Sequence, residues 1–66
     1  MNKTTEEIIS KTGLKQLKAA FNTLKPIMSD KQAMRFILRS VRPELKIFKP
    51  EYLIIRDELL RIIKHD

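Results

Sequence analysis

Apolar side chains along this chain recur every three or four residues, which is the spacing of one face of an α-helix. Four segments show this pattern, and capping residues, one glycine and three prolines separate them. We therefore predict an all-α protein, a small bundle of three to four helices over residues 5–12, 14–25, 29–41 and 50–64. The core positions expected in the second and third segments are Leu14, Leu17, Phe21, Leu24, Met34, Ile37, Leu38 and Val41.

Local signals set the predicted helix ends. Thr4 or Thr5 is suited to cap the first helix, because a hydroxyl accepts a hydrogen bond from the first turn. Gly13 is suited to end that helix, since glycine reaches a left-handed backbone without strain. Ser29 begins a capping box for the third helix, and Pro50 suits the first position of the fourth.

The fourth segment is apolar over about half of its circumference, which is a wide face for a small bundle to cover. Within it, Ile54 falls among polar positions, whereas Arg56 falls inside the apolar arc. We interpret this segment as the central helix or as one that also supports a homodimer, with Ile54 and Arg56 at a partner or dimer interface. The connection before it is expected to place one apolar side chain in the core: Leu45, Ile47 or Phe48.

The length of 66 residues allows a single domain, which we expect to span 1–66 with 1–4 and 65–66 frayed. A chain this short buries about 60% of its unfolded surface, so one apolar core must supply most of its stability. There is no cysteine to form a disulfide. The longest apolar run is far below the roughly 20 residues of a membrane span, so we expect a cytoplasmic protein for which membrane binding is unlikely.

The distribution of charge says more about the partners of this protein than its overall composition does. The chain has a net charge of +6, and eight Lys or Arg residues but one acid lie between Ile8 and Pro43. Their helical spacing predicts a first basic stripe of Lys11, Lys15, Lys18, Asn22 and Lys25. It predicts a second basic stripe of Lys31, Arg35, Arg39 and Arg42. A basic stripe repels itself and so favours a polyanionic partner, provided that packing brings both stripes to one side.

These stripes predict a small nucleic-acid-binding regulator that docks on phosphates, with DNA favoured over RNA and transcription as the expected process. A helix-turn-helix-like pairing of 14–25 with 29–41 has the right turn length, although Pro26 replaces the usual glycine. The alternative is a small adaptor or inhibitor that binds a protein through its basic face and apolar C-terminal helix. The simplest competing interpretation is that the stripes are ordinary solvated helix faces.

The sequence gives little support for catalysis, for a metal site or for a cofactor. The one histidine, His65, is the second-last residue, and no nucleophile can be paired with a base. We therefore expect no enzyme activity, no metal site and no cofactor. The aromatic residues lie mostly at core spacing, which disfavours stacking on unpaired bases: Phe21, Phe36, Phe48 and Tyr52.

Overall fold

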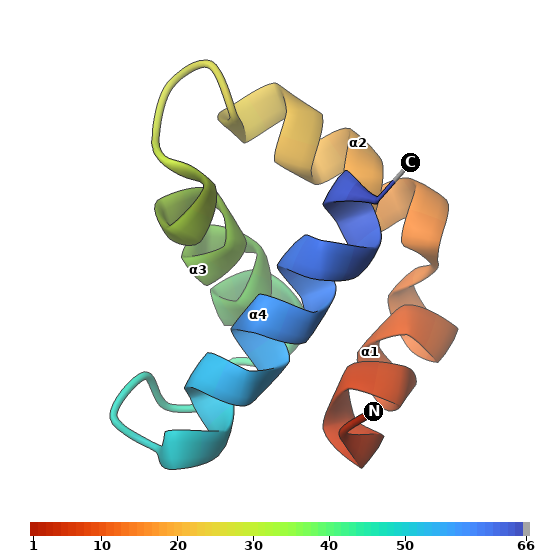
Figure 1. The fold of residues 1–66 in the computed structure, drawn as a ribbon, viewed down its shortest axis with the longest axis vertical. Helices are drawn as coiled ribbons and strands as arrows, with labels where there is room; N and C mark the ends of the chain where they lie inside the picture. The colour runs from red at the N-terminus through yellow and green to blue at the C-terminus, as the bar shows by residue number, and fades with distance from the viewer. Residues whose placement is uncertain (66) are drawn as a thin grey trace.

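The computed structural model describes residues 1–65, and within them the chain forms four α-helices and no strand (Figure 1). The helices are α1 (Lys3–Thr12), α2 (Leu14–Leu24), α3 (Asp30–Val41) and α4 (Pro50–Lys64). The prediction of a small all-α bundle is confirmed. The later three helices begin and end within one residue of their predicted bounds, whereas α1 begins two residues early.

Helices α2 and α4 each pack against the other three helices. In Figure 1 α4 runs between α3 on one side and α1 on the other, with α2 behind its C-terminal end. The core contains apolar residues of all four helices: Ile8, Leu17, Phe21, Ala33, Met34, Ile37, Leu38, Tyr52, Ile55, Leu59 and Ile63. Its members carry the predicted helical spacing. Among residues 1–65, no helix has both the length and the apolar character needed to cross a membrane.

The predicted signals at the ends of α1, α3 and α4 operate in the structure. The amide of Gly13 donates to the Ile9 carbonyl, and its φ of +90° turns the chain away from α1. The Ser29 hydroxyl accepts a hydrogen bond from the Gln32 amide at 3.3 Å, which caps α3. Pro50 occupies the first turn of α4, where its missing N–H leaves no bond unmade.

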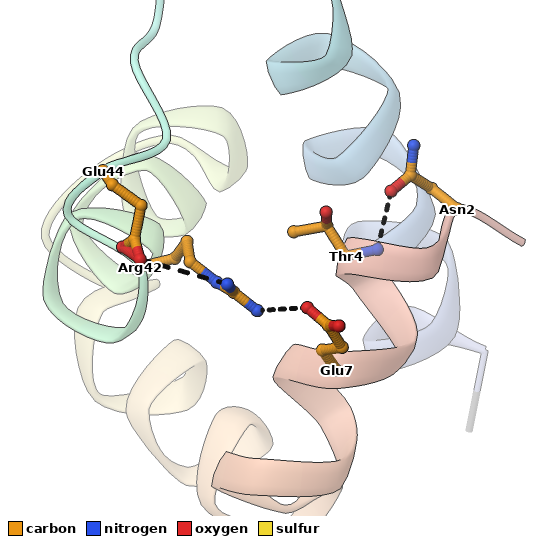
Figure 2. Close-up of polar contacts among 5 residues, drawn as sticks. All are labelled: Asn2, Thr4, Glu7, Arg42 and Glu44. Atoms are coloured by element: carbon orange, nitrogen blue, oxygen red, sulfur yellow. Dashed lines mark hydrogen bonds and ion pairs between the residues drawn. The ribbon is translucent and has the colours of Figure 1, made fainter.

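The cap of α1 differs from the prediction. Asn2, rather than Thr4 or Thr5, caps the helix, and its side-chain oxygen accepts from the Thr4 amide at 2.8 Å (Figure 2). Thr5 is instead fully buried, and its hydroxyl donates to Glu58 of α4 at 2.7 Å. Residues 3 and 4, expected to fray, are therefore helical. Of the two C-terminal residues expected to fray, His65 follows the end of α4 and Asp66 lies outside the described residues.

The expectation that the connection before α4 places one apolar side chain in the core is confirmed, because Leu45 packs against the core. Two of the four aromatic residues at core spacing lie instead on the surface. The side chain of Phe48 is 77% exposed and that of Phe36 is 53% exposed.

Glu58 joins α4 to the start of α1 and makes the fold sensitive to acid. The Thr5 hydroxyl and the Asn2 amide both donate to its carboxylate, and the hydrogen bond from Thr5 is the largest cause that lowers the pKa of Glu58 below 4.5. A lowered folded-state pKa means that this stabilisation is present above pH 4.5 and is lost as the pH falls through the folded-state value.

We therefore expect Glu58→Gln to lower the stability of the protein near neutral pH and to reduce its loss of stability between pH 7 and strongly acidic solution. Urea unfolding followed by circular dichroism over a pH series measures both quantities. Glu51→Gln, at an exposed position of the same helix, is the matched control. Equal pH dependence in Glu58→Gln and the native chain would contradict this role of Glu58.

Candidate nucleic-acid interface

The first basic stripe is shorter than the sequence suggested. Lys15, Lys18, Asn22 and Lys25 follow one another at steps of three, four and three along α2, which places them on one helix face. Lys11 belongs to α1, and the Gly13 turn interrupts the helical spacing that would align it with α2. The α2 stripe therefore consists of the four later residues, and Lys11 stands apart from it.

This α2 stripe meets the C-terminal end of α4. Lys18, Asn22 and Lys25 line a surface hollow of about 270 Å³ together with Ile63 and Lys64 of α4. Phe21 forms its apolar floor. Lys64 also forms an ion pair with Asp30, the first residue of α3. This ion pair connects the hollow to the start of α3. Packing thus brings the α2 stripe next to the start of the second stripe.

The second stripe ends at Arg39, because Arg42 turns to another partner. Arg42 follows the last residue of α3 with an extended backbone, φ −147° and ψ 71°. Its guanidinium lies 2.9 Å from the carboxylate of Glu7 on α1 and 3.9 Å from that of Glu44 (Figure 2). Arg42 therefore ties α3 to α1, and the α3 stripe consists of Lys31, Arg35 and Arg39.

The α3 stripe borders a second hollow, of about 290 Å³, between α3 and the N-terminal half of α4. Lys31 and Arg35 line it from α3, and Tyr52, Leu53 and Arg56 line it from α4. The side chain of Arg56 is only 16% exposed and forms an ion pair with Asp57 at 2.9 Å. Three cations thus surround one small hollow, which favours an anion there because the cations repel one another.

Tyr52 contributes a neutral hydroxyl to the same hollow. Burial raises the pKa of the Tyr52 phenol above 10.0, while the nearby guanidinium groups of Arg35 and Arg56 act in the opposite direction. The phenol therefore keeps its proton at neutral pH and is able to donate a hydrogen bond to an anionic oxygen. Arg35 offers planar paired donors that match the oxygens of a phosphate.

Both hollows lie on the same flank of α4. The α4 residues that line them are Tyr52, Leu53, Arg56, Ile63 and Lys64. At about 100° per residue these positions fall within roughly 120° of one another around the helix axis. Both stripes therefore border one flank of α4. We name as the basic surface the residues Lys15, Lys18, Asn22, Lys25, Lys31, Arg35, Arg39 and Arg56.

The opposite flank of α4 has a different character. Glu58 occupies it and holds α1 through Asn2 and Thr5. Lys11 lies on α1, and the ion pair of Arg42 with Glu7 joins the end of α3 to α1. The molecule thus has one flank lined by cations of α2 and α3 and an opposite flank where a carboxylate of α4 holds α1.

The two residues predicted at a partner or dimer interface have different surroundings. Ile54 lies on the outer face of α4 and is 52% exposed, so it is accessible to a second chain. Arg56 lies against α3 and belongs to the basic surface, which the sequence did not suggest. Its position inside the apolar arc of α4 was the signal that its stem packs while its head reaches the surface. The homodimer stays a prediction.

Comparison of the chain with protein-family models, with curated proteins and with solved structures finds no match. The basic surface is therefore the feature of this protein that bears on its function.

Proposed function

We propose that this protein is a small nucleic-acid-binding regulator that docks on phosphates through the basic surface. The supporting observation is that packing brings the α2 and α3 stripes to one flank of α4. At this flank Arg56 forms an ion pair with Asp57, and Lys64 forms one with Asp30. A surface of this kind is suited to follow a phosphate backbone, and lysines and arginines on phosphates position a protein without reading sequence.

We expect DNA rather than RNA as the ligand, with α2 and α3 used in a helix-turn-helix-like way. The expected process is regulation of transcription, in the cytoplasm. Arg35 and Arg39 are the residues suited to contact guanine edges, because a guanidinium donates two parallel hydrogen bonds. Asn22 lies within the α2 stripe and is the side chain suited to adenine. The lysines of α2 would contact phosphates only.

A mobility-shift assay over a salt series tests the proposal. If about four phosphates are neutralised, the logarithm of affinity should fall with the logarithm of salt at a slope near −3.6 for duplex DNA and near −2.8 for a single strand. Duplex DNA, single-stranded DNA and RNA serve as parallel probes. A slope near zero for all three would refute the proposal, because phosphate neutralisation always releases counterions.

A second candidate function is an adaptor or inhibitor that binds another protein. It is favoured by the exposure of Leu53 and Ile54, which lie next to each other on the outer side of α4. Large exposed apolar groups often mark protein-binding surfaces. Recovery of one stoichiometric protein partner that survives nuclease treatment, together with no salt-dependent nucleic-acid binding, would favour this candidate over the first.

A further inference from the structure

Two phenylalanine rings lie on the surface on either side of Arg35 and Arg39. Phe36 lines a hollow of about 240 Å³ with Gln32 and the two arginines. Phe48 lines a neighbouring hollow of about 370 Å³ that the same two arginines also border. The arginines therefore form a ridge with an exposed aromatic ring on each side. Exposed rings cost free energy in water, so their repeated placement beside cations points to a ligand.

The cations of the two hollows favour an anionic ligand, and their aromatic rings favour a planar one. Arg35, Arg39 and Lys46 supply positive charge, and none of the described carboxylates lines either hollow. The Lys49 ammonium lies 5.8 Å from the centroid of the Phe48 ring, which still leaves that ring 77% exposed. Aromatic faces beside a cationic track are how proteins hold single strands, since every base has a face that stacks and every nucleotide has a phosphate.

We infer that the ligand of the basic surface is a single-stranded nucleic acid, whose unpaired bases stack on Phe36 and Phe48 while its phosphates contact Arg35 and Arg39. This inference rests on the proposed binding of nucleic acid through the basic surface, and it replaces helix-turn-helix-like docking on a duplex with binding of a single strand. A duplex does not fit as well, because its base faces are stacked inside the helix and a surface ring meets only base edges or sugars.

An acidic segment of a partner protein is the competing occupant of these hollows. The single strand is favoured because Arg35 and Arg39 belong to both the aromatic hollows and the basic surface. A long polyanion uses this continuity over its whole length, whereas a short acidic segment would use only part of the basic surface. A second copy of this chain is disfavoured, because each copy carries a net charge of +6.

The test uses fluorescence anisotropy of the full chain with two probes, an oligo-dT strand and a mixed-sequence duplex of the same length, at low salt. Phe36→Ala and Phe48→Ala are each expected to weaken binding of the strand between roughly fivefold and a hundredfold. Binding of the duplex should change less than about twofold. Ile27→Ala removes an exposed apolar side chain that lines neither hollow, so it serves as the control for lost apolar surface.

Phe48→Trp gives an independent readout, because the native chain contains no tryptophan. This variant should retain affinity for oligo-dT, and its fluorescence should be quenched by the strand but not by the duplex. If both alanine variants bind the strand as tightly as the native chain, or lose affinity for strand and duplex alike, the inference is overturned while salt-dependent binding keeps the proposed function. If no probe binds, the proposed function falls and this inference falls with it.

Discussion

Replacing both Arg35 and Arg39 with glutamate is expected to weaken nucleic-acid binding by roughly sixtyfold or more at about 0.1 M salt. Each phosphate contact that is lost lowers the salt slope by about 0.9 on a duplex, and a slope smaller by about 1.8 corresponds to that loss of affinity. Repulsion between the new carboxylates and the phosphates adds to it. Both side chains are exposed, so the helix itself should remain folded.

The matched control for this pair is Lys3→Glu with Lys11→Glu. Both lysines are exposed on α1 and outside the basic surface, and the two pairs change the net charge by the same amount. The control should weaken binding only modestly, through the smaller overall field. Equal losses from the two pairs would mean that binding follows net charge alone, and the basic surface would then have no special role. Circular dichroism of both variants checks that folding is unchanged.

Leu59→Ala is expected to remove about 2–5 kcal/mol of stability, which is the cost of truncating a fully buried leucine and leaving a cavity. Leu59 is 0% exposed at the middle of α4, a helix that contacts all three others. A domain of this size has a total stability of about 3–10 kcal/mol, so the variant should be largely unfolded or close to it. Urea unfolding followed by far-ultraviolet circular dichroism measures the change.

Leu53→Ala provides the control on the same helix with the same chemical change. Leu53 is 49% exposed, so its truncation should cost less than about 1 kcal/mol. A similar loss of stability in the two variants would contradict the placement of α4, because it would mean that the outer face of the helix is buried in solution. A dimer that covers Leu53 would produce such a result, and sedimentation at several protein concentrations would identify it.

Much of the fold follows from signals that act over four residues or fewer. The Ser29 cap, the Gly13 turn and Pro50 each stop or start a helix through their own backbone chemistry, so the sequence predicts those boundaries closely. Helical spacing also identifies the core faces of α2 and α3, because a side chain that recurs every three or four residues must share one side of its helix. These features need no knowledge of the neighbouring elements.

The predictions that failed required a choice between residues with the same local preference for capping a helix or for entering the core. Asn2, Thr4 and Thr5 can all cap a helix, and Asn2 takes the role because Glu58 of α4 engages the Thr5 hydroxyl. Phe36 and Phe48 are apolar residues beside the core, and packing between helices decides which apolar groups it admits. Which residue caps α1 and which aromatic rings are buried therefore depend on contacts between residues that are far apart in the sequence.

The sequence by itself therefore determined the four helices, their core faces and the presence of two basic stripes. Only the tertiary structure decided that Arg42 pairs with Glu7, that Arg56 joins the α3 stripe, and that both stripes border one flank of α4. The physical reason is that periodicity places a residue around its own helix axis, whereas the rotation and crossing of helices depend on how their side chains fit together.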